Sequence, residues 1–315
     1  MTMSTTTVNL DRGLGNQLFT FHAGLYLGLA SNSKLVQFDM SGIQVEKQSR
    51  ASGIDDFEIQ ISGAPFEIEW KKRHKSSFQN LAERSIHKVF KRTEFTRKLM
   101  KQYRSITYGF DSKLSSLETP IQVWGNYQSW RYPIALVEAG IEIRFSLKNP
   151  TAWYLDWSKR ARSLRPIAIH LRRGDYANYA SSLGLLSYKY YLGALMQILD
   201  KRDQKIPEVW IFSDSLLAAT ELAQEGRQLL SANGYEGQVI VVSPPFESTS
   251  AENLLLLSMS QAIVSSNSSW SWWASWMAGR ETRVVVPNPY YKAFDGEFID
   301  HIPSFWHRYP SDFVQ

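Results

Sequence analysis

The chain has 315 residues, a formal net charge of +5 and no cysteine. This length is enough for two domains, each with its own hydrophobic core. Without cysteine there is neither a disulfide bond nor thiolate chemistry. No apolar run reaches the roughly 18 residues that a membrane-spanning helix needs. The uncharged first residues show no signal peptide, so we expect a cytosolic, bacterial protein.

The N-terminal half begins with the pattern of an α/β domain. Apolar periodicity predicts a strand, a helix that is apolar on almost all sides, a second strand and a later strand, at residues 5–10, 16–30, 34–39 and 120–124. Asn149-Pro150 interrupts the pattern and favours a domain boundary there. We therefore expect an N-terminal domain at 1–150 and a C-terminal domain at 151–315.

Positive charge is concentrated in one helical segment. Residues 70–104 contain twelve Lys and Arg against Glu83 and Glu94, so this segment carries about +10 and the rest of the chain about −5. A basic segment can bind an anionic membrane or nucleic acid, or it can present a solvated helical face. The solvated face is favoured. Peripheral contact between residues 71–104 and a membrane is the alternative, and no nucleic acid is expected.

The C-terminal half alternates short apolar runs with helical patterns. The runs predict strands at residues 166–171, 208–213, 238–243, 262–266 and 283–287. The helices are expected near residues 188–201, 216–232, 250–261 and 269–279. This alternation predicts a parallel sheet with helices on both faces, where ligands bind at the carboxyl ends of the strands.

The first of these strands ends in His170-Leu171-Arg172-Arg173-Gly174-Asp175. Arginine is rarely buried without a partner, and its planar set of N–H donors suits phosphate oxygens. The two arginines therefore indicate a site for a phosphorylated ligand. The alternative is a structural salt bridge between arginine and aspartate.

Two further strands end in polar groups that suit the same ligand. Asp214 can accept hydrogen bonds from guanine or ribose, or can cap the helix that follows it. Ser265-Ser266-Asn267-Ser268-Ser269 opens a helix, where free backbone N–H groups and the helix dipole favour an anion. Capping needs only one of these five residues, so an anion site is favoured.

Four tryptophans crowd the start of that helix, at positions 270, 272, 273 and 276. Helical spacing favours core packing for them, with one ring as a candidate wall of a sugar site. The sequence contains no convincing metal-binding motif. Arginines and helix ends, with no metal, are therefore expected to neutralise a bound diphosphate.

The loop Asp11-Arg12-Gly13-Leu14-Gly15-Asn16 joins the first predicted strand to its helix. Its two glycines let the backbone approach a ligand closely. Leu18 stands where a dinucleotide-binding motif has its third glycine, so the loop is a weak match to that motif.

Five segments follow one another along the chain: Gly13-Leu14-Gly15-Asn16-Gln17-Leu18-Phe19, Asn126-Tyr127-Gln128-Ser129 with Tyr132, His170-Leu171-Arg172-Arg173-Gly174-Asp175-Tyr176, Phe212-Ser213-Asp214, and Ser266-Asn267-Ser268-Ser269-Trp270-Ser271-Trp272-Trp273. In this order they resemble the motifs of the α-1,2-fucosyltransferase family (glycosyltransferase family 11), the second only loosely. The resemblance runs from about residue 8 to 290. Ser215 replaces a second acidic residue that is frequent in the family, and residues 62–118 match no family segment.

The resemblance implies an α/β fold of the GT-B type, with two Rossmann-like domains facing across a cleft. It implies GDP-β-L-fucose as donor and transfer, with inversion, to the 2-hydroxyl group of a terminal β-galactoside, for a bacterial surface glycan. It implies no cofactor and no metal. The acceptor glycan stays open, because residues 62–118 are expected to shape its site.

The resemblance also suggests roles for single residues. Arg172, Arg173 and His170 are the expected catalytic residues, with the arginines stabilising the departing diphosphate. The expected donor-binding residues are Gly13, Gly15, Asn16, Asp175, Asp214, Asn267, Ser268 and Ser269. A base near the acceptor hydroxyl suits one-step inversion, and Asp11 and Asp39, both at predicted strand ends, are its weak candidates.

Three alternatives remain open from the sequence. A nicotinamide-dependent oxidoreductase would use Gly13, Gly15 and Asp39, but it leaves residues 170–176 without a role. A non-catalytic glycan-binding protein would use the tryptophans and would not need GDP. A third alternative keeps the fold and reaction with another GDP-6-deoxyhexose as donor.

Overall fold

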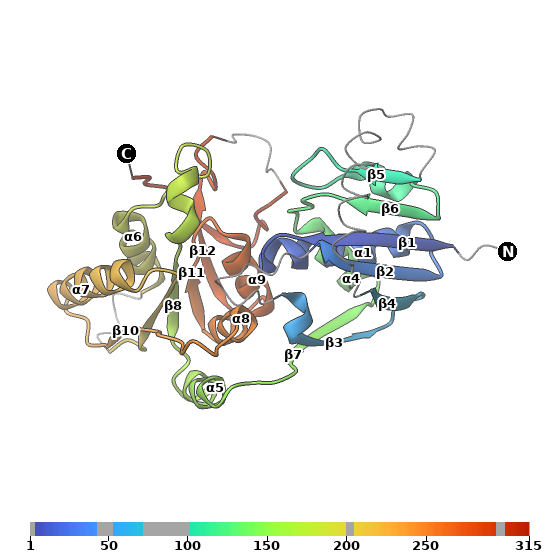
Figure 1. Cartoon of the computed structure of the whole chain (residues 1–315). Coiled ribbons are helices and arrows are strands. Elements are labelled where there is room, and N and C mark those ends of the chain that lie inside the picture. The colour runs from blue at the N-terminus through green and yellow to red at the C-terminus, as the bar shows by residue number, and fades with distance from the viewer. Residues whose placement is uncertain (1–3, 43–52, 72–100, 200–204, 294–299, 315) are drawn as a thin grey trace. The chain divides into compact units, whose positions relative to one another are not determined.

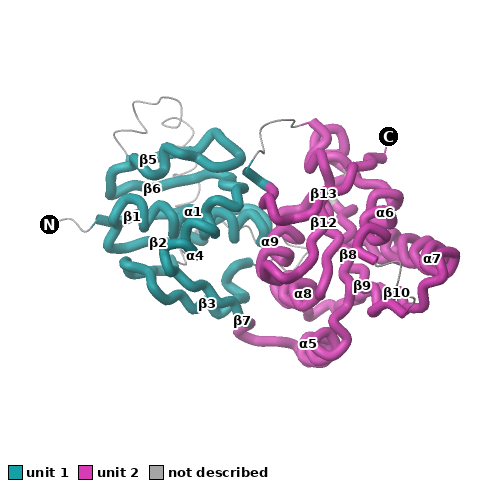
Figure 2. The backbone as a smooth tube through the Cα atoms, turned by 180° about the vertical axis from the view of Figure 1, so that it is seen from behind, with its two compact units in different colours: residues 1–146, 297–301 teal, residues 147–296, 302–315 magenta. Residues whose placement is uncertain are grey.

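The computed structural model describes residues 4–42, 53–71, 101–199, 205–293 and 300–314. The chain forms two compact units (Figure 2). Unit 1 comprises Met1–Ser146 and Glu297–His301, and unit 2 comprises Leu147–Gly296 and Ile302–Gln315. A short segment late in the chain therefore returns to unit 1.

Unit 1 is built on a five-stranded parallel sheet with strand order β4-β2-β1-β6-β5. Its strands are β1 (Thr5–Asp11), β2 (Leu35–Gly42), β4 (Glu67–Lys71), β5 (Gln102–Arg104) and β6 (Ile121–Trp124). A separate two-stranded sheet pairs β3 (Phe57–Ser62) with β7 (Glu142–Leu147). The unit also contains α1 (Leu14–Ala30), α4 (Arg131–Glu138) and short 3-10 helices at Ile54–Asp56 and Ser112–Ser116.

Helix α1 is buried almost all round, as its apolar sequence predicts. Two glycines let it lie close against the sheet. A Cβ atom on Gly24 would stand 2.8 Å from both Phe38 and Val8, and one on Gly28 would stand 2.3 Å from Val36. The start of α1 lies just beyond the carboxyl end of β1, directly after the glycine-containing loop.

Unit 2 is built on a six-stranded parallel sheet with strand order β10-β9-β8-β11-β12-β13. The strands are β8 (Ile167–Leu171), β9 (Val209–Ser213), β10 (Val239–Val241), β11 (Ala262–Val264), β12 (Arg283–Asn288) and β13 (His307–Pro310). The helices are α5 (Ala152–Leu164), α6 (Tyr188–Ile198), α7 (Leu216–Ala232), α8 (Ser250–Ser258) and α9 (Ser269–Met277). Figure 1 shows α6 and α7 on one face of this sheet and α8 and α9 on the other.

The α/β class with parallel sheets, expected for each half of a GT-B fold, is thus confirmed. Each sheet also has one point where the strand order reverses direction. In unit 2 the chain runs from β8 outward to β9 and β10, then returns to β11 on the other side of β8. In unit 1 the corresponding point lies between β1 and β6. Ligands of open parallel sheets bind at such switch points, beyond the carboxyl ends of the strands.

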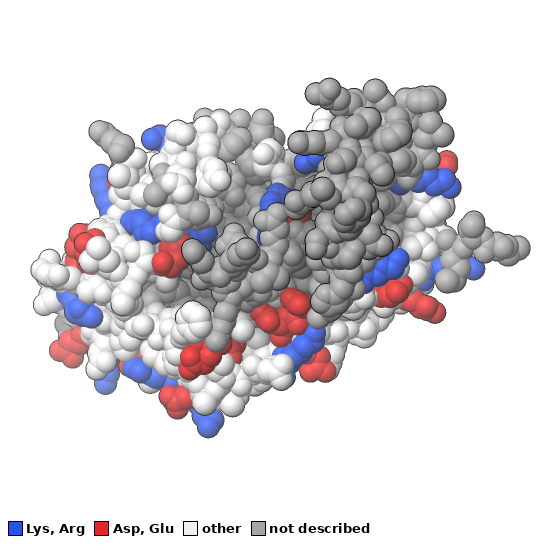
Figure 3. Space-filling view, in the orientation of Figure 1, with Lys and Arg blue, Asp and Glu red and all other residues white. Residues whose placement is uncertain are grey.

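The basic segment falls mostly outside the described residues. Nine of its twelve Lys and Arg lie within 72–100, so the expectations of a solvated helical face or of membrane contact there are not examined by the structure. On the face in Figure 3, described acidic and basic side chains are interspersed. Among the described helices, none combines the length and apolar character needed to cross a bilayer.

Candidate functional site

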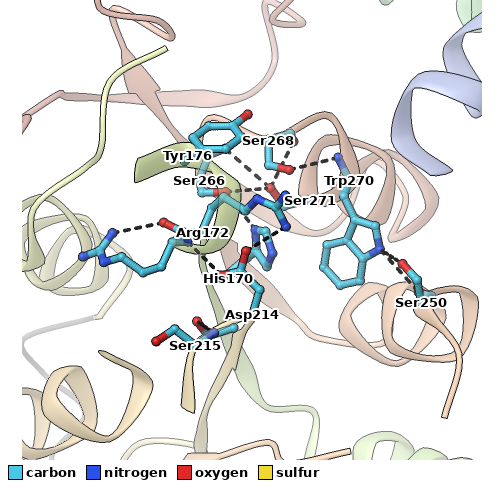
Figure 4. A network of polar contacts seen from close by, with 12 residues as sticks. His170, Arg172, Tyr176, Asp214, Ser215, Ser250, Ser266, Ser268, Trp270 and Ser271 are labelled. Carbon is cyan, nitrogen blue, oxygen red and sulfur yellow. Dashed lines mark hydrogen bonds and ion pairs between the residues drawn. The ribbon is translucent and has the colours of Figure 1, made fainter. Parts of the chain in front are cut away.

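The predicted site residues form two groups, one at the switch point of each sheet. In unit 2, the carboxyl end of β8 carries His170 and Arg172, and the neighbouring β11 leads into the serine-rich turn before α9. Asp214 follows β9 on the other side of β8. Figure 4 shows these side chains converging at this edge of the sheet.

His170 is a buried, neutral member of this group. One imidazole nitrogen, Nδ1, lies 2.8 Å from Oγ of Ser266, and the ring lies against Trp270 with 4.7 Å between centroids. Burial, and secondly the charge of Arg172, lower the pKa of His170 to about 3. Its contribution at neutral pH is therefore orientation and hydrogen bonding, without a positive charge.

Arg172 and Asp214 form a partly exposed ion pair at the centre of the group, so the salt bridge named above as the alternative to a phosphate site is present for Arg172. Nη1 of Arg172 lies 2.8 Å from Oδ2 of Asp214, and the two side chains are 28% and 25% exposed. The backbone N–H of Arg173 donates to the other carboxylate oxygen at 2.8 Å. Ser215, not Asp214, is the N-cap of α7, so the alternative that Asp214 caps this helix is wrong.

Gly174 makes room for that ion pair. A Cβ atom on Gly174 would stand 2.4 Å from Oδ2 of Asp214, a distance that van der Waals repulsion forbids. The Asp214 carboxylate reaches Arg172 only because this position has no side chain. The next residue, Asp175, lies in a 3-10 helix, Gly174–Tyr179, and its side chain is outside the described part of the structure.

Arg173 has quite different surroundings from Arg172. Its Nη1 donates to the backbone carbonyls of Arg172, at 3.1 Å, and of Leu186, at 2.9 Å. The guanidinium also lies over the rings of Tyr188 and Tyr191, at 5.1 and 5.9 Å from their centroids. These contacts tie the loop after β8 to the start of α6.

The serine-rich turn is a buried hydrogen-bonded scaffold. Ser268 is the N-cap of α9 and accepts a bond from the backbone N–H of Trp270, so the capping interpretation is confirmed for this one residue. Asn267 donates from Nδ2 to the carbonyls of Leu183 and Gly184, both at 2.9 Å. Ser269, the first residue of α9, is partly exposed. An anion site at this helix start remains a prediction.

Some of the tryptophans of α9 pack in the core, and one lies beside the candidate site. Trp272 and Trp273 are fully buried, which confirms core packing for them, and Trp272 stacks on Trp276 at 5.5 Å. Trp270 instead lies beside His170, and its Nε1 donates to Oγ of Ser250 at 2.8 Å (Figure 4). Trp270 is therefore the ring of this cluster that belongs to the switch point.

In unit 1, the glycine-containing loop follows the end of β1. Nε of Arg12 lies 2.9 Å from Oδ1 of Asp11, and Nη2 of Arg12 donates to the carbonyl of Gly125 after β6. Asn16 accepts a bond from Nε2 of Gln128 at 2.7 Å, which joins the first and second sequence motifs. Gly13 is the N-cap residue of α1, and Gly15 is buried in its first turn.

The structure corrects the position of Asp39. It is 6% exposed and lies within β2, which continues to Gly42, so it is not at a strand end as expected. The strand is longer than its apolar run because it stays paired with β1 beyond that run: Asp39 lies opposite Asn9, and Gly42 lies opposite Asp11. Asp11 does end its strand, and its side chain is 44% exposed.

Sequence reasoning missed the segment that returns to unit 1. The backbone N–H of Trp130 donates to the carbonyl of Asp300, and Nδ1 of His301 lies 3.1 Å from the carbonyl of Gln128. Burial lowers the pKa of His301 to about 4, so it is a neutral, buried histidine like His170 and His22. No local pattern could predict these contacts, because they join residues about 170 positions apart.

Among the described residues, no three His, Asp or Glu side chains gather in a way that would hold a metal ion.

Comparisons with known proteins were made on the whole chain. The model of glycosyl transferase family 11 matches residues 64–300. An α-1,2-colitosyltransferase of Escherichia coli is 23% identical over 311 residues, which cover 97% of this chain and 99% of that protein. Similar solved structures include the fucosyltransferase NodZ from Bradyrhizobium, with 12% identity, a TM-score of 0.46 and coverage of 87% of this chain and 92% of that one. The structure of POFUT1 in complex with GDP-fucose shares 13% identity, with a TM-score of 0.49 and coverage of 89% and 97%. Because the family model spans most of the chain, this protein is a glycosyltransferase and belongs to glycosyl transferase family 11.

Proposed function

We propose that the protein transfers L-fucose from GDP-β-L-fucose to the 2-hydroxyl group of a terminal β-galactoside. The transfer inverts the anomeric centre, needs no metal and serves a bacterial surface glycan. The observation that carries the proposal is the half-exposed Arg172–Asp214 pair at the switch point of unit 2, beside the start of α9. This is the edge of a parallel sheet where a nucleotide diphosphate binds.

The reaction replaces one bond at C1 of the sugar with another. The acceptor oxygen forms a bond to C1 while the bond from C1 to the β-phosphate oxygen breaks, and GDP leaves with the bonding electrons. Negative charge grows on the diphosphate as the sugar becomes oxocarbenium-like. Arg172 stabilises that charge because its donors are fixed in place by Asp214 before the substrate arrives.

The other residues of the switch point orient the donor. Backbone N–H groups at Ser268 and Ser269 point along the start of α9 and suit a phosphate oxygen. Neutral His170 supplies a hydrogen bond, while Asn267 and Arg173 hold the loops around the donor. Asp214 acts chiefly through Arg172, since both of its carboxylate oxygens already accept bonds.

The proton of the acceptor hydroxyl passes to a carboxylate or to water. Asp11 is the better placed of the two predicted bases, because it is exposed at the carboxyl end of β1 whereas Asp39 is buried within β2. The backbone of the glycine-containing loop lies at the same edge of the sheet, at Gly13, Gly15 and Asn16. A transition state in which the bond to phosphate is largely broken needs little help from a base.

A second donor is favoured by one specific finding. The relative that covers 97% of this chain is named an α-1,2-colitosyltransferase. Colitose is L-fucose without its 3-hydroxyl group, so both donors present the same leaving group to Arg172. The same linkage and the same site then serve either sugar.

The test is a transfer assay with the purified protein. GDP-fucose and GDP-colitose are each incubated with a panel of β-galactosides in the presence of EDTA, and the product linkage is determined by NMR. We expect an α-1,2-linked product with at least one donor. Absence of any product, or product formed only when magnesium is restored, would refute the proposal.

A further inference from the structure

Arg12 has a backbone conformation that arginine rarely adopts. Its φ angle is +63°, in the left-handed region that favours glycine. Such a conformation is costly for a residue with a side chain, and it persists only where the surroundings hold it in place. Three hydrogen bonds do so here. Two come from the guanidinium, to Asp11 and Gly125, and the third is accepted by the Arg12 carbonyl from Nε2 of Gln17 at 2.6 Å.

Glycine at this position would keep part of this arrangement without strain. The bond from Gln17 uses only the backbone carbonyl of residue 12, which glycine also has. The start of α1 is likewise independent of the Arg12 side chain, because Asn16 and Gln17 donate their backbone N–H groups to the carbonyl of Gly13. The side chain adds one structural bond, to Gly125, and the pair with Asp11.

The guanidinium and its partner carboxylate face open space. The side chains of Arg12 and Asp11 are 40% and 44% exposed. A Cβ atom on the adjacent Gly13 would meet nothing within 4 Å. Only Nε and Nη2 of Arg12 donate hydrogen bonds to described residues, so three of its five N–H donors remain available there. All of this lies at the switch point of unit 1, between β1 and β6.

We propose that the Asp11–Arg12 pair binds the acceptor sugar through its hydroxyl groups and that Arg12 determines acceptor affinity. The inference rests on the proposed function, which requires a site for a neutral galactoside. This exposed guanidinium and carboxylate present N–H donors and an oxygen acceptor side by side. Their adjacent donors and acceptor match neighbouring sugar hydroxyls, each of which both donates and accepts.

The test compares two arginines that share the same backbone conformation. Arg12→Gly removes the guanidinium and relieves the strain. Arg165→Gly is the matched control, because Arg165 is also left-handed, with φ +46°, and is exposed after α5 in unit 2. Binding of methyl β-D-galactoside and lactose is titrated by saturation-transfer NMR with GDP present, and melting temperatures are recorded.

We expect Arg12→Gly to bind these galactosides at least tenfold more weakly, with unchanged affinity for GDP. The control is expected to bind them as the wild type does. Arg12→Lys keeps the charge but not the planar donors, and we expect it to be weakened as well. It also provides the test if the glycine variant does not fold.

Galactoside binding at wild-type strength in the Arg12 variants would overturn the inference. With a lowered melting temperature, that result would make Arg12 a structural tie to Gly125. A wild-type protein that binds no galactoside would overturn it too. A wild-type protein that binds galactosides but transfers neither sugar would refute the proposed function while leaving this inference intact.

Discussion

Both sheets carry an arginine–aspartate pair at their switch points, and the two pairs differ in exposure and in the residues around them. In unit 2, Arg172, Arg173 and Asp214 together carry one net positive charge, leaving aside Asp175, whose side chain is outside the described residues. In unit 1, Asp11 and Arg12 cancel each other and are more exposed. We propose that the first pair, with Arg173 beside it, receives a diphosphate and that the second, more exposed pair binds a sugar. The surroundings of each pair, more than the fold, decide what it binds.

The largest expected effect follows from removing the cationic donor of unit 2. Arg172→Ala should lower kcat/KM for transfer by about 10²–10³-fold, since a preorganised donor to the leaving group is lost. Initial rates with GDP-fucose or GDP-colitose measure this. Arg160→Ala is the matched control, because Arg160 also pairs with a carboxylate at 2.8 Å, on Glu208 just before β9, at the opposite edge of the sheet. Near-normal rates for Arg172→Ala would remove the central role given to this residue.

Replacing the neighbouring Arg173 should affect stability more than replacing Arg172 does. Arg173→Ala removes two charged hydrogen bonds to the carbonyls of Arg172 and Leu186. We expect it to lower the free energy of unfolding by about 2 kcal/mol, measured by urea denaturation. Arg172→Ala, whose guanidinium bonds a half-exposed carboxylate, should destabilise less. Equal stability losses in the two variants would contradict the distinction drawn between them.

The space at Gly174 gives a sharper test of the Arg172–Asp214 pair. Gly174→Ala should lower kcat/KM by about tenfold, because the new Cβ atom displaces the Asp214 carboxylate from Arg172. In an Asp214→Ala background, the same change should have almost no further effect. A double-mutant cycle measures this coupling. Additive losses would show that Gly174 acts on something other than Asp214.

Buried His170 predicts how stability depends on pH. Its pKa in the folded protein, about 3, lies below the value near 6.5 of an unfolded chain. The unfolded state therefore binds the proton first, and stability present above pH 6.5 is lost as the pH falls from 6.5 towards 3. Over this range each such histidine lowers the free energy of unfolding by about 1.4 kcal/mol for every pH unit that the pH falls.

The variant His170→Asn keeps a polar group near Ser266 but cannot take up that proton. We expect a shallower fall of the unfolding free energy between pH 6.5 and 4, by the slope of one histidine. An identical slope in His170→Asn and wild type would argue against a buried neutral His170.

Sequence patterns predicted the buried elements well and the exposed ones poorly. Strands β8, β9 and β12 read as continuous apolar runs because helices cover both faces of their sheet. The bounds expected for helix α7 match those observed, Leu216–Ala232, although its cap is Ser215 and not Asp214. By contrast, β13 was missed because its residues are largely exposed and show no apolar period. The edge strands β4 and β5 were missed as well: β5 has only three residues, whereas β4 alternates Ile68 and Trp70 with charged residues and carried a pattern that was overlooked.

The sequence predicted which residues form the site but not which partner each of them contacts. The motif that ends β8 identified both arginines, yet only the fold shows that Leu186 accepts a bond from Arg173 while Asp214 pairs with Arg172. The left-handed conformation of Arg12 has no sequence signal, and one of the three hydrogen bonds that hold it goes to Gly125, which is 113 residues away. Long-range contacts of this kind decide which of two similar side chains meets the substrate.

The most direct measurement is GDP binding to the wild type and to Arg172→Ala by isothermal titration calorimetry in the presence of EDTA. The account predicts that GDP binds the wild type without metal and binds the variant at least tenfold more weakly, while methyl β-D-galactoside binding stays the same. Equal GDP affinity in the two proteins, or binding that requires magnesium, would contradict the claim that Arg172 receives the diphosphate at the switch point of unit 2.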